Sequence, residues 1–452
     1  MKSTVFSKVF LLFVSSFLLV IMEACDQIIE NHWNNSSTTK LKIDSVPKFP
    51  KGYYILEAET FHKSFKSDDF MQSPTGYYLS RMSEFYPMAS IYRSGNISPL
   101  GNELNDEIGD FRSETHFGDL SLDKYVELGN CQGYLVIQHG QIVYENYHNS
   151  RALDKHLWNQ NSCIVLSACV GLLEEEGKLD PSKGVGTYVS ELNGTAWENI
   201  PVQDLLDMTS GIHCLDNDTS KIKKDKKPNY LFQVSTGMIA DPLVYKLTKN
   251  VKSFLKTLQK SKPNGVKFEY SSANAQVLGW IIESITNIPY ADYVSDKFWS
   301  RIGTEGDASI ILSQAGTPVF GKGMNSNLRD MGRFAMLFTP SWYNITRNQI
   351  LPKPFIDKIQ KGGRKVMFSN SPEAEEYLKS FAGDAPVSNS RLFDLVWDDG
   401  DFWKSGGGDQ GIYISPKRDL VIVYVGVNPD AHQTDLMHFT RELAKSNLFR
   451  KI

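Results

Sequence analysis

The sequence is poor in cysteine, with 5 among 452 residues. One of them, Cys25, follows an N-terminal apolar run, and the other four are Cys131, Cys163, Cys169 and Cys214. Disulfide scaffolds are much denser in cysteine, and zinc sites need Cys or His at short, regular spacings. The pattern excludes both, and we expect neither a metal nor a cofactor.

The sequence also lacks an excess of basic residues. Its 48 Lys and Arg are outnumbered by 52 Asp and Glu, which gives a net charge of -4 and a pI near 6.2. A nucleic-acid partner is therefore not expected, because binding to phosphates needs a cationic surface. The Lys-rich run at residues 221–227 is local, and we interpret it as a solvated loop.

Long apolar runs are absent except near the N-terminus, where Lys2 and Lys8 precede the apolar residues 9–22. This run is short for a membrane span and typical of a signal peptide. Residues 22–25, Met-Glu-Ala-Cys, resemble a bacterial lipoprotein processing box, which predicts export and a membrane anchor through lipid on Cys25. An ordinary secretory peptide cut nearby is the alternative.

The rest of the chain is long enough for one large domain or two modest ones. We expect a polar tether at 26–51, rich in Asn, Ser and Thr, and an aromatic but irregular lead-in at 52–120. The main domain is expected at 121–452.

Strands are predicted at both ends of this domain. Residues 134–145 read as a β-hairpin around Gly140, and residues 411–427 as two strands before a final helix at about 430–448. Helical patterns lie between them, near residues 202–208, 274–286, 291–301 and 328–338. The arrangement predicts an α+β fold, in which both termini build one antiparallel sheet around a helical insert.

A buried helix stands out at residues 157–179. Residues 164–173 are apolar on nearly every side, and the helix is expected to end at Gly177. Its first turn, Asn159 to Cys163, is polar, where free backbone N–H groups and the positive end of the helix dipole lie. Such a turn is a common place for a nucleophile.

Several short sequence segments in this domain occur in an order that is typical of one protein family. They are Gly140–Glu145, Asp204–Ile212 (DLLDMTSGI), Phe268–Asn274 (FEYSSAN), Leu328–Phe334 (LRDMGRF) and Trp403–Gly406 (WKSG). Together they resemble the serine β-lactamase and penicillin-binding-protein superfamily. The resemblance is greatest to the branch of class C β-lactamases, D-Ala-D-Ala peptidases, esterases and nylon-oligomer hydrolases. It implies an all-α lobe beside an α/β lobe, with the active cleft between them.

The chemistry of that family depends on a Ser-x-x-Lys pair that opens the buried helix. Residues three apart share a helix face, so the lysine can hold or remove the serine proton. The resemblance further implies that the tyrosine of the second motif, Tyr270, assists proton transfer. It assigns Lys404 in the third motif to binding the substrate carboxylate.

The nucleophile and its base are missing from this helix. Alignment on Gly171 and Gly177 without a gap places Gln160 at the serine position and Cys163 at the lysine position. An amide is not a nucleophile here, and a thiol does not replace an ammonium. Ser-x-x-Lys occurs elsewhere, but none of those copies opens a buried apolar helix, and we interpret them as chance.

The remaining motif positions are retained. Tyr270 and Lys404 are expected to point into the cleft, with Ser272, Ser405 and Gly406 as ligand-binding positions. Ser272 stands where class C enzymes carry Asn, which argues against β-lactam specificity.

The leading hypothesis is an exported protein that has lost acyl transfer and binds a peptide, a cell-wall fragment or another amide or ester ligand. A hydrolase with a different nucleophile is the alternative, and a lesion in the sequence is a third explanation. Cys163 could be that nucleophile, because a helix N-terminus lowers a thiol pKa, but a Cys in an apolar helix is more often inert. His139, His156 and His213 are isolated and are interpreted as structural.

Overall fold

The computed structural model describes residues 79–449 apart from residues 219, 221, 224–225, 240, 249 and 427–433. The predicted signal segment with Cys25 and the predicted tether lie outside these residues. No helix in the described ranges has the length and apolar character needed to cross a membrane.

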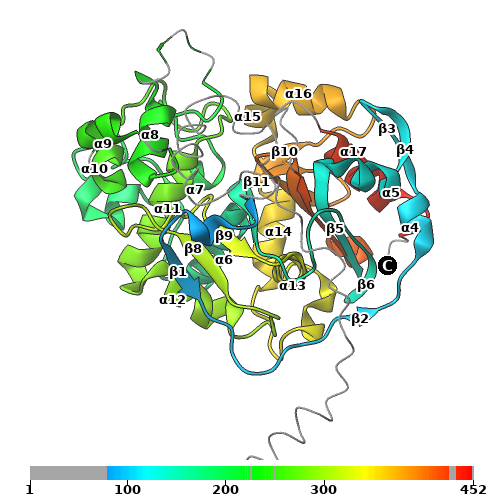
Figure 1. Cartoon of the computed structure of the whole chain (residues 1–452). Helices are drawn as coiled ribbons and strands as arrows, with labels where there is room; N and C mark the ends of the chain where they lie inside the picture. The colour runs from blue at the N-terminus through cyan, green and yellow to red at the C-terminus, as the bar shows by residue number, and fades with distance from the viewer. Residues whose placement is uncertain are drawn as a thin grey trace, which may run out of the picture. The chain divides into compact units, whose positions relative to one another are not determined.

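The largest sheet has eight strands in the order β10-β11-β12-β13-β14-β5-β6-β2. Their bounds are β10 Ser388–Ser390, β11 Phe393–Val396, β12 Phe402–Gly406, β13 Gln410–Ser415, β14 Leu420–Gly426, β5 Cys131–Gln138, β6 Gln141–Tyr147 and β2 Gly101–Asn102. Every neighbouring pair is antiparallel except β2 and β6. Because β14 pairs with β5, the predicted sheet from both ends of the domain is confirmed, and with it the α+β class (Figure 1).

The predicted hairpin is formed by β5 and β6. Its turn residues His139 and Gly140 have φ angles of 51° and 75°. Two positive φ angles match the twist of the flanking strands, which explains the glycine.

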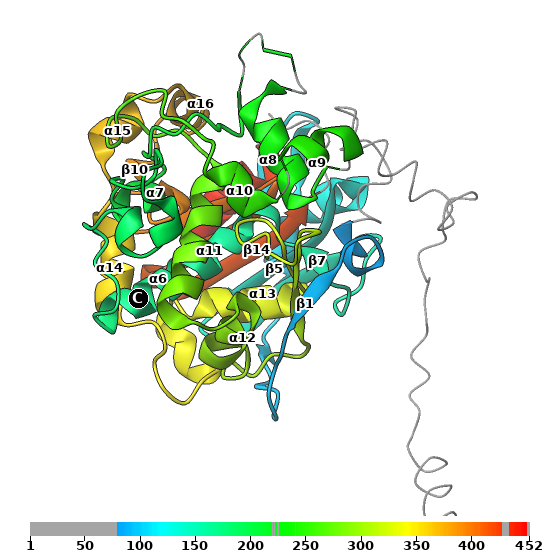
Figure 2. The ribbon, with the colours of Figure 1, turned by 90° about the vertical axis from the view of Figure 1, so that its left-hand side faces the viewer.

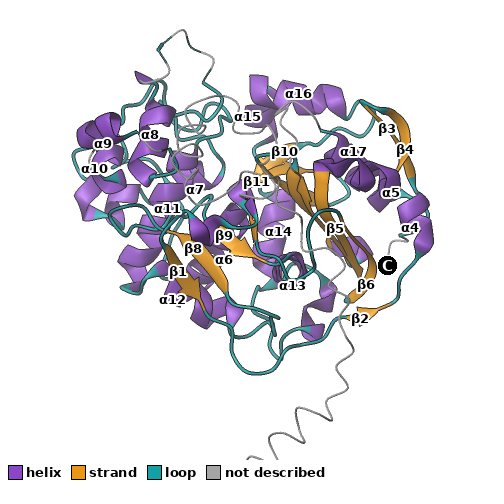
Figure 3. Cartoon of the chain, viewed as in Figure 1, coloured by secondary structure: helices purple, strands orange, loops and turns teal. Residues whose placement is uncertain are grey.

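The helices come mostly between β6 and β10 in the chain. Their bounds are α4 Asp106–Asp110, α5 Leu122–Tyr125, α6 Cys163–Glu175, α7 Val202–Leu206, α8 Pro228–Thr236, α9 Pro242–Thr248, α10 Val251–Leu255, α11 Ser272–Thr286, α12 Tyr290–Val294, α13 Leu328–Met336, α14 Lys353–Lys361, α15 Lys365–Ser369, α16 Pro372–Ser380 and α17 Asp435–Lys445. Figure 3 shows these helices around the strands.

Helices α13 and α17 cover opposite faces of the large sheet. The hydroxyl of Tyr134 on β5 lies 2.8 Å from that of Thr440 on α17. The next side chain, Leu135, and Ile137 lie beside Gly332 of α13, where an added Cβ would come within 2.7 Å of Ile137. Successive strand residues point to opposite faces, so both faces of β5 are buried.

The predicted buried helix is α6, and a short 3-10 turn, Asn159–Ser162, leads into it. Its residues from Cys163 to Gly171 are all buried, and Gly177 has a φ of +68° just past its end. Helix α11 packs against α6, and the two lie together in Figure 2. Helix α6 is therefore enclosed from Cys163 to Gly171, whereas Asn159 and Gln160 in the turn before it are half-buried.

A smaller sheet and a hairpin complete the described structure. The four-stranded sheet has the order β1-β8-β9-β7, with bounds β1 Met88–Ile91, β8 Ala308–Ile311, β9 Met324–Ser326 and β7 His156–Leu157. The hairpin consists of β3 Arg112–Thr115 and β4 Gly118–Ser121. Strand β7 leads directly into the turn before α6, so this sheet positions that turn.

Candidate functional site

Gln160 lies in the turn before α6, and its side chain binds the backbone beyond β12. The N–H of Gly407 donates to Gln160 Oε1 at 2.9 Å. The neighbouring Asn159 donates from Nδ2 to the carbonyl of Gly407 at 3.1 Å. Gly407 is exposed, so its N–H is a donor that a ligand carbonyl could otherwise reach. In this structure the side-chain amide oxygen of Gln160 accepts the hydrogen bond from this donor.

Cys163 begins α6 and is fully buried. Its Sγ lies 3.6 Å from the hydroxyl of Tyr270 and 3.5 Å from the carbonyl oxygen of Gly321, to which the thiol donates. Burial raises the pKa of Cys163, although the ammonium of Lys404 acts in the opposite direction. The thiolate is the reactive form of cysteine. A raised pKa therefore keeps Cys163 as an unreactive thiol at neutral pH.

Tyr270 lies directly before α11 and joins Cys163 to Lys404. The ammonium of Lys404 is 4.6 Å from the centroid of the Tyr270 ring, within the range of a cation–π interaction. Burial raises the pKa of Tyr270 well above its usual value, so its hydroxyl keeps its proton. We call Gln160, Cys163, Tyr270 and Lys404 the motif cluster. The structure brings Cys163, Tyr270 and Lys404 into contact, and Gln160 lies in the turn that leads into Cys163.

Lys404 is fully buried on β12 and forms an ion pair with Asp394 of β11. Its Nζ is 2.8 Å from both carboxylate oxygens of Asp394. Ser405 donates to the same carboxylate from its backbone N–H at 2.9 Å and from its hydroxyl at 2.5 Å. The cation expected to bind a ligand carboxylate is thus already bound to one from the protein.

Ser272 lies at the start of α11 and is held by Asp216. Its N–H donates to Asp216 Oδ1 at 2.9 Å and its hydroxyl to Oδ2 at 2.6 Å. Lys322 donates to the same Oδ2 at 2.9 Å. The serine at the position of the family's Asn is therefore part of a second internal ion-pair network.

Gly406 closes β12 beside the turn before α6. An added Cβ there would lie 2.7 Å from Nδ2 of Asn161 and 3.0 Å from the carbonyl of Trp158. Such contacts force neighbouring atoms to move, so the glycine allows β12 and this turn to approach each other.

Three charged residues that form ion pairs at this site were missed from the sequence, namely Asp216, Lys322 and Asp394. Asp394 gave a usable signal, because a carboxylate inside the apolar run Phe393–Val396 needs a buried cation as its partner. Asp216 and Lys322 lie in loops far apart in the chain and gave none.

Glu373 of α16 adds a group that titrates near neutral pH. Its Oε2 accepts from the backbone N–H of Tyr270 at 2.9 Å. Burial raises the pKa of Glu373 to about 7, and the hydrogen bond from Tyr270 only partly opposes this. The folded state therefore favours the protonated carboxyl.

This raised pKa predicts a pH-dependent loss of stability. Protonated Glu373 stabilises the fold fully below pH 4.5, and this contribution is lost as the pH rises through about 7. Glu373→Gln stays neutral, so between pH 5 and 8 it should gain about 1–3 kcal/mol in unfolding free energy relative to the wild type. Urea unfolding at several pH values measures this difference. Glu375→Gln, on the same helix but exposed, is the matched control. If the free energy of unfolding changes with pH in the same way for the wild type and for Glu373→Gln, the prediction is contradicted.

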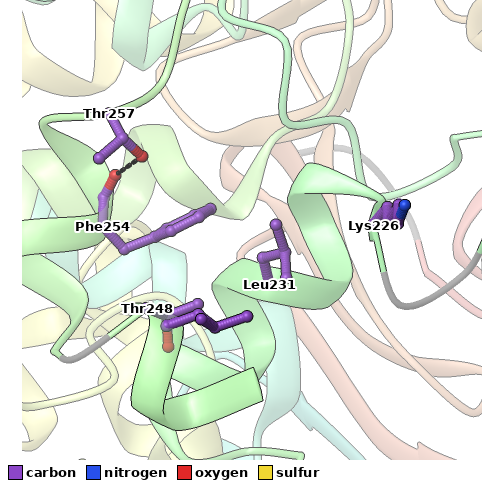
Figure 4. Close-up of a pocket in the computed structure, with 6 residues that line it drawn as sticks. Lys226, Leu231, Thr248, Phe254 and Thr257 are labelled. Carbon is purple, nitrogen blue, oxygen red and sulfur yellow. Dashed lines mark hydrogen bonds between the residues drawn. The ribbon is translucent and has the colours of Figure 1, made fainter. Parts of the chain in front are cut away.

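A cavity of about 310 Å³ lies among α8, α9 and α10, and no residue of the motif cluster lines it. Its lining residues are Lys226, Leu231, Leu247, Thr248, Phe254 and Thr257. The hydroxyl of Thr257 donates its proton to the carbonyl of Phe254, as Figure 4 shows. None of the sequence motifs points to this cavity.

Comparison with known proteins agrees with the sequence motifs and the fold. A family model described as Beta-lactamase matches residues 133–438. A 6-aminohexanoate-dimer hydrolase from Paenarthrobacter ureafaciens is 24% identical over 367 residues, which cover 80% of this chain and 88% of that protein.

Two solved structures are similar to this fold. A protein of Bacillus anthracis assigned as a 6-aminohexanoate-dimer hydrolase has a TM-score of 0.71 at 23% identity, over 83% of this chain and 94% of that one. A beta-lactamase/D-alanine carboxypeptidase from Yersinia pestis has a TM-score of 0.54 at 15% identity, over 75% of this chain and 98% of that one. At such identities the likeness shows the fold alone.

Proposed function

The chain belongs to the beta-lactamase family, and we propose that it binds its ligand at the motif cluster without forming a covalent acyl intermediate. The ligand class is a peptide, a cell-wall fragment or another molecule with an amide or ester group. The observation that carries the proposal is the hydrogen bond from Gly407 to Gln160, the residue at the position of the family's serine.

The size of the catalytic loss supports binding rather than turnover. Removing members of an acyl-transfer unit costs on the order of a millionfold in rate, and binding and the oxyanion donors leave an acceleration of roughly a thousandfold or more over water. Here Gln160 offers no hydroxyl, and buried Cys163 offers no ammonium. Acyl transfer through this helix therefore lacks both its nucleophile and its base.

The groups that remain suit a neutral amide or ester. When the Gln160 amide swings away, the exposed N–H of Gly407 can donate to a ligand carbonyl in its place. Exchanging one amide oxygen for another conserves the hydrogen bond, so the displacement costs little. This exchange favours ligands with a peptide-like carbonyl.

Covalent labelling tests the proposal directly. The purified wild-type protein is incubated with a fluorescent penicillin and with a fluorophosphonate probe, and labelling is measured by in-gel fluorescence and mass spectrometry. We expect no signal above that of heat-denatured protein, because the site lacks a nucleophile. Labelling at any residue of the motif cluster would overturn the non-covalent function.

Hydrolysis with a different nucleophile is the second candidate, since the relative from Paenarthrobacter ureafaciens is a hydrolase by name. Two hydroxyls near the cluster donate to carboxylates, from Ser405 to Asp394 at 2.5 Å and from Ser272 to Asp216 at 2.6 Å. This function requires turnover of a generic ester that is lost in Tyr270→Phe or Lys404→Met. Absence of turnover across an ester and β-lactam panel would count against it.

A further inference from the structure

Asp394 is bound in the way that proteins bind a carboxylate ligand. Its two oxygens receive the ammonium of Lys404, the hydroxyl of Ser405 and the backbone N–H of Ser405. A charged donor, a hydroxyl and a backbone N–H are the usual partners of a recognised carboxylate. The three donors all belong to the third motif of the sequence.

The ion pair of Lys404 and Asp394 is shielded from solvent, and its two opposite charges compensate each other. The side chain of Lys404 is 0% exposed and that of Asp394 is 5% exposed. Two charges lose their hydration when they are buried, and only a partner of opposite sign with good geometry compensates for this loss. A ligand carboxylate that approached Lys404 would place a second anion beside Asp394 in a poorly screened environment.

We propose that Asp394 is a resident carboxylate that occupies the binding group of Lys404 and Ser405, so that the site selects ligands without a carboxylate at this position. The selectivity follows from Asp394 alone, because the donors themselves are intact. The inference rests on the proposed binding function, since it specifies which ligands that site accepts. It assigns a specificity-determining role to a residue outside the motif cluster.

Removing Asp394 should turn the group into an open carboxylate site. In Asp394→Ala the missing atoms correspond to a formate ion, and Lys404 loses its anionic partner. Sodium formate should raise the melting temperature of this variant by several degrees, whereas formamide, its neutral isostere, should not. The wild type in the same formate series reports non-specific salt effects and should not respond. A rise shared by wild type and variant would overturn the proposal.

A second experiment distinguishes selection of an external ligand from mere replacement of the missing carboxylate by formate. N-acetyl-D-alanine and its carboxamide are compared on Asp394→Ala, because a ligand of this size must enter from outside. We expect the acid to stabilise the variant and the amide not to. Rescue by formate without any effect of the acid would mean that Asp394 is only a structural partner, which overturns the proposal.

Two further variants keep the test decisive. In Asp394→Ala with Lys404→Met the cation is absent, so the response to formate should disappear, and a persisting response would overturn the proposal. If Asp394→Ala does not fold in plain buffer, refolding yields with formate and with formamide are compared, and equal yields would overturn it. Labelling of the wild type tests the proposed function separately, since that result does not depend on Asp394.

Discussion

Replacing Gln160 by Ser together with Cys163 by Lys is expected to give covalent labelling by a fluorophosphonate, at least about a hundredfold above that of either single variant. The factor reflects general-base assistance, which contributes roughly 100- to 10,000-fold. The two positions lie three apart at the start of α6, so a new hydroxyl and a new ammonium would lie on the same side of the helix. In-gel fluorescence and mass spectrometry at position 160 measure the effect.

The surrounding groups support this expectation. Removing the Gln160 side chain frees the N–H of Gly407 for a developing oxyanion, and Tyr270 already lies 3.6 Å from the side chain at position 163. A penicillin probe should label more weakly than the fluorophosphonate, because its carboxylate meets Asp394. The single variants serve as matched controls. A folded double variant without labelling would contradict the alignment of Gln160 and Cys163 with the family's serine and lysine.

Asp401→Ala is expected to lower the free energy of unfolding by about 3–5 kcal/mol, the usual cost of removing one partner from a buried ion pair. Asp401 is fully buried immediately before β12. It accepts hydrogen bonds from Arg418 at 2.6 Å, from Arg441 at 2.9 Å and from Ser415 at 2.6 Å, and another from the Tyr413 hydroxyl. Its loss leaves two buried guanidinium groups short of an anion. Urea or thermal unfolding measures the change.

The matched control is Asp398→Ala, three residues earlier in the same loop. Its side chain is 77% exposed and pairs with Lys365 at 3.2 Å. Exposed pairs contribute little, so this change should stay within about 0.5 kcal/mol of the wild type. Equal effects of the two substitutions would contradict the assignment of Asp401 as the central anion. Asp399 also pairs with Arg418 and Arg441, so it partly replaces the anion that Asp401→Ala removes. The decrease in unfolding free energy for Asp401→Ala is therefore expected near the lower end of its range.

The elements of the fold were largely predictable because their signals are local. The helix predicted at 274–286 is α11, Ser272–Thr286, and the one at 328–338 is α13, Leu328–Met336. Apolar spacing determines such elements, and it acts within one or two turns of chain. The helix predicted at 291–301 is split into α12 and a π-helical turn at Ser295–Trp299. The local pattern does not distinguish these two windings.

The site was predictable only in part. The motif order predicted that Gln160, Cys163, Tyr270 and Lys404 share one site. In the fold Tyr270 contacts both Cys163 and Lys404. The hydrogen bond between Gln160 and Gly407 joins residues 247 apart, and no periodicity within a segment reports such a contact. The second ion-pair network, formed by Asp216 and Lys322, depends in the same way on loops that meet only in the folded chain.

The sequence by itself determined the α+β class, the buried helix and the absence of Ser-x-x-Lys at its start. Each of these follows from residue types and their spacing along the chain. The tertiary structure alone decided that Lys404 pairs with Asp394 and that the side chain of Gln160 accepts a hydrogen bond from Gly407. The physical reason is that pairing depends on distance and burial, and both are set when β11, β12 and the turn before α6 pack together.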